Sequence, residues 1–217
     1  YRFGYQTAVD QKNTDKMFRD IEKKVGKDVK TEEYESLTDE ANALLNGNVD
    51  AAVFNEGYMS MIDESVEGFS DQVRVLYQYG IKTKLKEEKK ADVQEPFNVF
   101  ISGIDVSGPI TTNSRSDVNI IMTVNPNTKQ ILLTTTPRDY YVTIPNVSGD
   151  ARDKLTHAGI YGVDASMATL ENLYGIDISY YARVNFTSLE TIVDALGGVD
   201  VNSEVEFEKN GYSFHKG

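Results

Sequence analysis

Two short motifs in this chain of 217 residues place arginine within two residues of aspartate: SRSD at residues 114–117 and PRD at residues 137–139. Each motif borders an apolar segment that is typical of a strand. Arginine grips phosphate oxygens two at a time through its planar guanidinium group. A pair of carboxylates, completed by phosphate oxygens and water, is a usual environment of Mg²⁺. These residue types therefore favour a site for a pyrophosphate and a divalent cation.

The two motifs are predicted to share one end of a hairpin. Residues Asp117–Val124 and Gln130–Thr136 alternate as strands around NPNTK, a cluster of turn-forming residues. We expect Val124 to lie opposite Gln130, so that the numbers of opposed residues sum to 254. A slip of one or two residues would change the pairs but not the end at which they lie.

This register predicts that Asp117 faces Pro137 and that Arg115 faces Asp139. Arg115, Asp117, Arg138 and Asp139 then share the open end of the hairpin.

Asp105 joins this group under one further assumption. It follows a mostly apolar segment, Phe97–Ser102, and has a glycine on either side within GIDVSG. If this strand runs beside the hairpin and ends at the same edge, the carboxylate of Asp105 reaches the site, and the glycines allow the backbone to approach a ligand closely.

Other interpretations of these residues stay open. The arginine and aspartate pairs are equally typical of surface ion pairs or turn caps. His157 in DKLTHAG is expected to make local hydrogen bonds. A catalytic triad with a nucleophile is disfavoured, because the chain has no cysteine and its serines near the motifs have no visible base.

Apolar strands alternate with amphipathic helices in the second half of the chain. Helices are predicted at GVDASMATLENLYG and at TSLETIVDALGG, the second with a capping box of Thr187 and Glu190, and a half-buried strand at VDVNSEVEF. Mixed strands and helices of this kind favour an α/β fold in which helices cover both faces of a central sheet.

The first half is predicted to be a separate small α+β domain. Helical spacing and caps indicate helices that end at Gly26 and Gly47, and a short helix containing Tyr58. Strands are expected at Asp50–Asn55 and Gln72–Ile81. The charged segment Lys82–Pro96 is typical of a linker, so we divide the chain into an accessory domain at 1–95 and a second domain at 96–217.

Charge and hydropathy exclude several classes of protein. The net charge is −12, and both halves carry −6 (14 Lys and Arg against 20 Asp and Glu in 1–95; 8 against 14 in 96–217). Nucleic acid is therefore not an expected partner, since phosphate neutralisation needs clustered cations. No apolar run reaches the length of a transmembrane helix.

From Phe97 onward the chain resembles the LytR-CpsA-Psr family, most closely its streptococcal capsule-biosynthesis branch. The resemblance covers about 120 residues: FNVFISGIDVSG, NSRSDVNIIMTVNPNTKQILLTTTPRDYYVTIP, DKLTHAGIYG and ARVNFTSLETIVDALGGVDV. It implies a three-layer α-β-α sandwich around a central mixed sheet, whose apolar cavity takes a polyprenyl tail. It also implies a segment beyond residue 217 with further arginines, and a membrane anchor before Tyr1.

The resemblance implies an Mg²⁺-dependent phosphotransferase at the outer face of the cell membrane of a Gram-positive bacterium. Its donor would be a capsular polysaccharide, or a teichoic-acid-like glycan, on a polyprenyl-pyrophosphate lipid, and its acceptor peptidoglycan. Asp105 and Asp117 would hold the metal, and Arg115 and Arg138 would bind the pyrophosphate. Asp105 and Arg138 are the expected catalytic residues, with Asp105 as the only candidate base, and Asp139 would orient Arg138.

Two alternatives to this enzyme remain. A regulator that binds polyprenyl phosphates without turning them over needs the same arginines and the same apolar cavity. A binding module centred on residues 1–95 is disfavoured, because that half lacks clustered polar or aromatic anchors.

Overall fold

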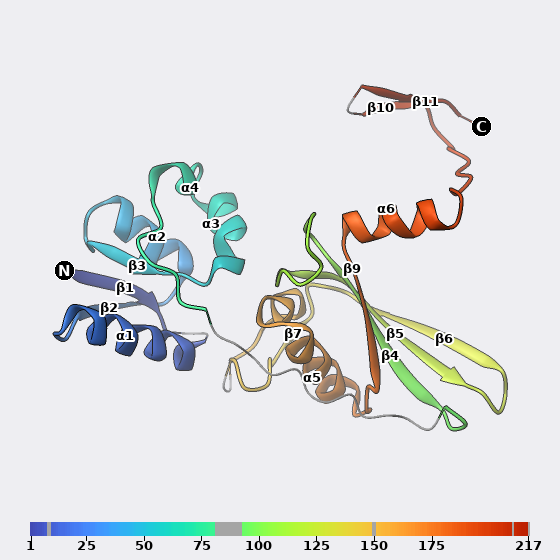
Figure 1. Cartoon of the computed structure of the whole chain (residues 1–217), viewed down its shortest axis with the longest axis horizontal. Coiled ribbons are helices and arrows are strands. Elements are labelled where there is room, and N and C mark those ends of the chain that lie inside the picture. Colours follow the sequence, from blue (N-terminus) through green and yellow to red (C-terminus); the bar gives the residue numbers. More distant parts are fainter. Residues whose placement is uncertain (8–9, 81–92, 149–150, 210, 217) are drawn as a thin grey trace.

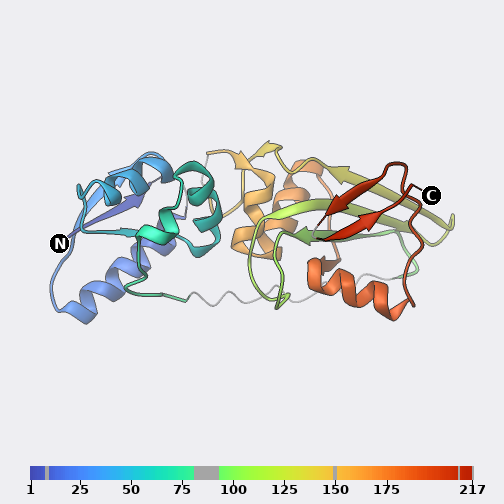
Figure 2. The ribbon, with the colours of Figure 1, turned by 90° about the horizontal axis from the view of Figure 1, so that it is seen from above.

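A computed structural model of the chain describes residues 1–7, 10–80, 93–148, 151–209 and 211–216. The elements form two units that lie side by side in both views of the molecule (Figures 1 and 2). The N-terminal unit is residues 1–80 and the C-terminal unit is residues 93–216, each with its own sheets. No helix in the described ranges is long and apolar enough to cross a membrane.

The N-terminal unit is built on a three-stranded parallel sheet in the order β2-β1-β3. Its elements are β1 (Arg2–Gln6), α1 (Gln11–Val25), β2 (Lys30–Tyr34), α2 (Leu37–Leu45), β3 (Ala51–Val53), the 3-10 helix η1 (Glu56–Tyr58), α3 (Met59–Ser65) and α4 (Phe69–Gln72). The predicted helices are confirmed. Gly26 ends α1 in the left-handed conformation, and the hydroxyl of Ser36 accepts a hydrogen bond from the Asp39 amide at the start of α2.

The predicted strand at Gln72–Ile81 is wrong. Gln72 ends α4, and residues 73–80 form neither strand nor helix. None of the strands in the described residues pairs with this stretch, and Val75 and Leu76 are exposed. The predicted linker falls mostly on residues 81–92, outside the described residues, and the domain boundary at residue 95 stays a prediction.

The C-terminal unit is built on a mixed four-stranded sheet in the order β6-β5-β4-β9. Its elements are β4 (Phe97–Ile104), β5 (Ser116–Asn125), β6 (Gln130–Thr136), β7 (Tyr141–Val142), β8 (Asp153–Lys154), the 3-10 helix η2 (Leu155–Tyr161), α5 (Val163–Tyr174), β9 (Tyr180–Val184), α6 (Phe186–Ala195), β10 (Phe207–Lys209) and β11 (Tyr212–Phe214). Strands β4 and β9 are parallel, whereas β5 pairs with β4 and with β6 in antiparallel fashion.

The hairpin of β5 and β6 forms as predicted, but its register differs by one residue. Val124 lies opposite Ile131, and Asn125 opposite Gln130. The difference arises in the turn, where the side chain of Asn125 accepts hydrogen bonds from the amides of Asn127 and Thr128. Asn125 therefore serves as the last paired residue of β5 and leaves a shorter turn than the sequence suggested.

One face of this sheet is buried at its centre, and the other is partly exposed. Phe100 of β4 and Ile121 of β5 pack against Leu155 of η2 and Leu170 of α5. On the opposite face Ile131 and Leu133 of β6 are 65% and 60% exposed. Helices of the described ranges thus cover one face, and the third layer of the expected sandwich stays a prediction.

Two local predictions for the end of the chain are wrong. The capping box of α6 consists of Asn185 and Ser188, and the hydroxyl of Thr187 accepts a hydrogen bond from the amide of Gly108. The predicted strand at VDVNSEVEF is absent as far as residue 206, and Val201 and Val205 are exposed. Alternating apolar residues do not form a strand there, because no strand within the part of the chain that the structure describes pairs with them.

Candidate functional site

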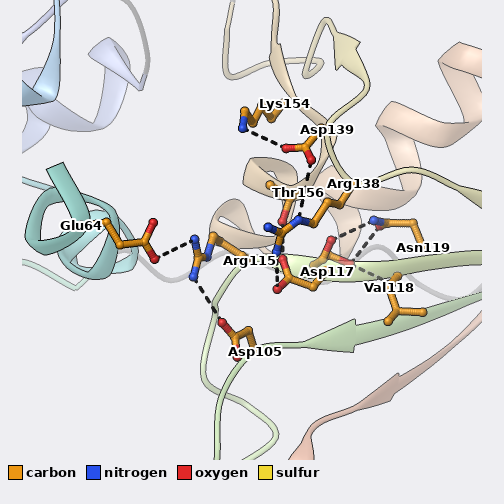
Figure 3. Close-up of polar contacts among 11 residues, drawn as sticks. Glu64, Asp105, Arg115, Asp117, Val118, Asn119, Arg138, Asp139, Lys154 and Thr156 are labelled. Carbon is orange, nitrogen blue, oxygen red and sulfur yellow. Dashed lines mark hydrogen bonds and ion pairs between the residues drawn. The ribbon is translucent and has the colours of Figure 1, made fainter.

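The charged residues of the two motifs meet at one end of the sheet (Figure 3). Arg115 and Asp117 lie at the start of β5, Arg138 follows β6, and Asp105 follows β4. Guanidinium nitrogen Nη2 of Arg115 donates to Oδ2 of Asp105 at 3.2 Å. The prediction that these three strand ends lie at one edge of the sheet is therefore confirmed, and the roles of the residues stay predictions.

The predicted pairs across the hairpin are wrong in detail. Asp117 pairs with Arg138, whose Nη1 donates to Oδ2 of Asp117 at 2.9 Å, rather than facing Pro137. The ladder ends at Asn119 and Thr136, and extending its register by two residues would place Asp117 opposite Arg138.

Asp139 lies beside Arg138 but has another partner. Its Oδ2 is 3.8 Å from Nε of Arg138, whereas its Oδ1 is 2.9 Å from Nζ of Lys154. The hydrogen bond from Lys154 is the main cause that lowers the pKa of the Asp139 carboxyl. The expectation that Asp139 orients Arg138 stays a prediction, with Lys154 holding the same carboxylate.

A bulge at the start of β5 turns Asp117 toward the site. Gly103 pairs with Val118 and the next residue, Ile104, pairs with Ser116, so Asp117 is the extra residue. A buried polar network holds this bulge. The hydroxyls of Ser102 and Ser116 lie 2.8 Å apart, and the side-chain amide of Asn119 donates to the carbonyl of Ser116 at 2.8 Å.

Sequence reasoning missed this network. Its signal was the presence of Ser102 and Asn119 inside apolar strands, at positions that the structure buries. Polar side chains at such positions find hydrogen-bond partners within the protein.

The segment η2 supports the site from the buried side of the sheet. The hydroxyl of Thr156 donates to Oδ1 of Asp117 at 2.9 Å, and its amide donates to the carbonyl of Arg138 at 2.9 Å. A Cβ atom on Gly159 would lie 2.5 Å from the carbonyl oxygen of Ser114. Only glycine therefore allows η2 to pack this closely against the SRSD motif.

The sequence pointed to this segment for a different residue, His157. Its ring nitrogen Nδ1 lies 2.7 Å from Oδ1 of Asp153, four residues earlier. The prediction that His157 makes a local hydrogen bond is confirmed. The role of its neighbour Thr156 was missed, because no pattern within the segment shows that it reaches Asp117.

A carboxylate from the N-terminal unit also reaches the site. Oε1 of Glu64 in α3 lies 3.5 Å from Nη1 of Arg115, so that Glu64 and Asp105 approach the guanidinium from different sides (Figure 3). The side chain of Arg115 is 16% exposed, whereas that of Glu64 is 66% exposed. The sequence predicted only a solvated acidic face there.

The donors suit a divalent cation that takes part of its coordination from a ligand. Within the described residues no three histidine, cysteine, aspartate or glutamate side chains form a cluster that could hold a metal. Asp105 and Asp117 supply two carboxylates at adjoining strand ends, and Mg²⁺ is commonly bound by one or two carboxylates with substrate phosphates and water. Each carboxylate is paired with one arginine. An anion can therefore bind the two arginines while a cation binds the two aspartates, so that together they replace both ion pairs.

Comparison with known proteins identifies the family. A family model, the LytR_cpsA_psr family, matches residues 64–217. The chain belongs to the LytR-CpsA-Psr family. The SRSD and PRD motifs, and the whole η2 segment, lie within the matched residues.

Relatives in the LytR-CpsA-Psr family carry names that state their reaction. The chain is 37% identical over 161 residues to the polyisoprenyl-teichoic acid--peptidoglycan teichoic acid transferase TagU of Bacillus cereus, which covers 74% of this chain and 52% of the relative. It is 37% identical over 136 residues to TagU of Enterococcus faecalis, covering 62% of this chain and 44% of the relative. The chain thus spans about half the length of these relatives.

A solved structure of the family supports the fold. The crystal structure of Bacillus subtilis TagV matches with a TM-score of 0.51 and 27% sequence identity, over 57% of this chain and 50% of that chain. The mixed α/β fold of the matched part of the chain is therefore that of a LytR-CpsA-Psr domain.

Proposed function

We propose that the protein is a phosphotransferase that moves a cell-wall glycopolymer from a polyprenyl-pyrophosphate carrier onto peptidoglycan. The observation that carries this proposal is the meeting of two arginine–aspartate pairs at one sheet end in a chain of the LytR-CpsA-Psr family. The names of the TagU relatives support the donor and the acceptor. Because the chain spans half of these relatives, the activity is proposed for the whole protein.

In this reaction an acceptor hydroxyl of peptidoglycan attacks the phosphorus atom that bears the glycan. The bond from that phosphorus to the bridging oxygen breaks, polyprenyl phosphate leaves, and the hydroxyl proton passes to a base. Arg115 and Arg138 are the proposed phosphate ligands, and Arg138 would also stabilise the charge that develops on the leaving phosphate. Asp105 is the proposed base, with a side chain that is 39% exposed, and it would take the proton on the carboxylate oxygen that does not hold the metal.

Mg²⁺ is the proposed cofactor, with Asp105 and Asp117 as its protein ligands. When bound it would neutralise phosphate charge and polarise the reacting phosphoryl group. Both carboxylates are now partners of the arginines, so a metal that takes them leaves the guanidinium groups free for the phosphates. The binding of the metal and of the pyrophosphate should therefore favour one another.

The open face of the sheet supports a further layer for the lipid. Two apolar surfaces are exposed: Ile131 and Leu133 on β6, and a stripe of α6 that contains Leu189 and Ile192. Apolar surfaces of this kind are usually covered by another part of the protein or by a ligand. We propose that these surfaces complete the three-layer sandwich and its cavity for a polyprenyl tail. From the family resemblance we further propose that the protein acts at the outer face of a Gram-positive cell membrane.

The glycan is proposed only by class. The names of the relatives favour a teichoic acid, whereas the sequence resembles the capsule branch of the family. A regulator that binds polyprenyl phosphates without transferring the glycan remains the second candidate, because it would use the same arginines.

Calorimetric titration of geranyl pyrophosphate into the intact extracellular protein, with and without Mg²⁺, tests the proposal. We expect binding that strengthens with Mg²⁺ and is lost in Arg138→Ala. If binding depends neither on Mg²⁺ nor on Arg138, the arginine–aspartate pairs are surface ion pairs only. Turnover of a polyprenyl-pyrophosphate-linked glycan then separates the transferase from the regulator.

A further inference from the structure

The hydrophobic core of the N-terminal unit is completed by a residue of η2. Ile160 is 3% exposed and belongs to a cluster with Ala41, Tyr58, Ile62 and Phe69. The other four residues of this cluster come from α2, η1, α3 and α4. The two units therefore share a core, and separating them would expose Ile160 and its neighbours to water.

The packing around Ile160 leaves no spare room. A Cβ atom on Gly57 would lie 2.5 Å from Cγ2 of Ile160, so glycine is needed for this approach. The hydroxyls of Tyr58 and Tyr161 are hydrogen-bonded to each other, and the ring of Tyr58 meets that of His157 edge to face, with centroids 5.9 Å apart. Burial raises the pKa of Tyr58, as expected of a hydroxyl removed from water.

The same short segment holds the phosphate site. Within η2, Thr156 contacts Asp117 and the carbonyl of Arg138, while Ile160 and Tyr161 contact the N-terminal unit. Gly159 lies between these contacts and packs against the backbone of the SRSD motif. A displacement of one side of η2 therefore moves the other, since only a few residues separate them.

We propose that the N-terminal unit is a positioning domain for the phosphate site, which fixes Asp117 and Arg138 by docking on η2. The naming of the site as a phosphate site rests on the function proposed above. The positioning itself rests on the contacts of Ile160 and Thr156.

Through Glu64 the N-terminal unit has a second effect on pyrophosphate binding, which weakens it. Its carboxylate lies 3.5 Å from Nη1 of Arg115, where it repels an incoming anion. Removing the charge of Glu64 should strengthen pyrophosphate binding, whereas undocking the N-terminal unit should weaken it. A background of Glu64→Gln removes the charge effect and leaves the positioning effect to be measured.

The test is Gly57→Ala, whose new methyl group crowds Ile160, compared with Gly80→Ala, where a Cβ atom meets nothing within 4 Å. Both are made in the intact protein in the Glu64→Gln background. The readouts are calorimetric affinity for inorganic pyrophosphate with Mg²⁺, and hydrogen exchange of peptides that cover residues 115–119 and 137–140. Ile160→Val is a milder second variant, which loosens the same contact by deletion rather than by crowding.

We expect Gly57→Ala to weaken pyrophosphate binding about threefold to tenfold and to speed exchange in both peptides, with Gly80→Ala unchanged. Ile160→Val should act in the same direction with a smaller effect. Some variants should undock the N-terminal unit, which is seen as faster hydrogen exchange at Tyr58 and Tyr161. If exchange at residues 115–119 and 137–140 is unchanged in those variants, the positioning role is overturned. Failure of the parent protein to bind pyrophosphate, with the exchange effect present, would instead overturn the proposed function and leave the positioning intact.

Discussion

The hydroxyl of Thr156 donates a hydrogen bond to Oδ1 of Asp117 at 2.9 Å. The other oxygen of this carboxylate accepts from Nη1 of Arg138 at the same distance. Both oxygens of Asp117 are thus held by donors, and the carboxylate has one defined orientation. Hydrogen bonds to ionised groups are stronger than those between neutral groups, so the contact from Thr156 is more than a packing detail.

Replacing Thr156 with valine should weaken the proposed site, and serine should preserve it. Valine keeps the shape of the side chain but has no hydroxyl, which leaves Oδ1 of Asp117 without this donor. We expect a roughly tenfold loss of affinity for pyrophosphate in the presence of Mg²⁺, the size typical of a hydrogen bond to a charged group. Calorimetry measures it, and equal losses in Thr156→Val and Thr156→Ser would show that the hydroxyl is not responsible.

Asp117→Asn should abolish the effect of Mg²⁺ on pyrophosphate binding, because the amide is a poor metal ligand and carries no charge. Asp200→Asn is the matched control, since Asp200 is exposed and takes part in none of the ion pairs of the site. We expect the control to leave affinity unchanged, as for a surface substitution away from the site. If Mg²⁺ still strengthens pyrophosphate binding in Asp117→Asn, this carboxylate is not a ligand of the metal.

Glu64→Gln should strengthen pyrophosphate binding at low salt. The glutamine is similar in size but does not repel the anion near Arg115. The gain should be at most about fivefold, because exposed charge pairs contribute up to about 1 kcal/mol. It should shrink as salt is added. Weaker binding at every salt concentration would mean that Glu64 holds Arg115 in its working position.

Stability should fall as pH rises because of Glu40. This side chain is fully buried in the N-terminal unit, one carboxyl oxygen accepts from the amide of Val53, and the other has no hydrogen-bond partner among the described residues. Burial raises its pKa from 4.5 to about 8. The folded state therefore keeps a proton that the unfolded state releases, and the free energy of unfolding declines between pH 4.5 and about 8.

Glu40→Gln should remove this decline. Urea unfolding at pH 5 and pH 8 should show that the variant gains stability relative to the parent at the higher pH, by up to about 4 kcal/mol. The two proteins should be closer at pH 5. A difference that does not change with pH would indicate that Glu40 is ionised in the folded protein.

Gly159→Ala should destabilise the C-terminal unit by about 1–3 kcal/mol, the usual cost of overpacking. The new methyl group would meet the carbonyl oxygen of Ser114 at 2.5 Å and the amide nitrogen of Ser116 at 2.7 Å, both of which belong to backbone that cannot rotate away. Gly80→Ala is again the control. Thermal unfolding measures the difference, and equal midpoints would show that η2 and the SRSD motif are not in close contact.

Much of the local structure followed from the sequence because its causes lie within a few residues. The ends of α1 and α5 are set by Gly26 and Gly175, which adopt left-handed conformations that other residues rarely take. The apolar strands and the turn between them gave the hairpin. The strands predicted at Gln72–Ile81 and at the end of the chain failed, because a strand also needs a partner in space.

The candidate site also has features with local causes and features that depend on contacts between distant parts of the chain. The sequence by itself determined that SRSD and PRD share one end of a hairpin, since the turn between them is short and antiparallel pairing leaves no other arrangement. Only the tertiary structure decided which residues pair, through a register set by the side chain of Asn125 and a bulge at Asp117. It also brought Thr156 and Glu64 to the site from distant parts of the chain, because such contacts depend on packing between elements rather than on their own sequence.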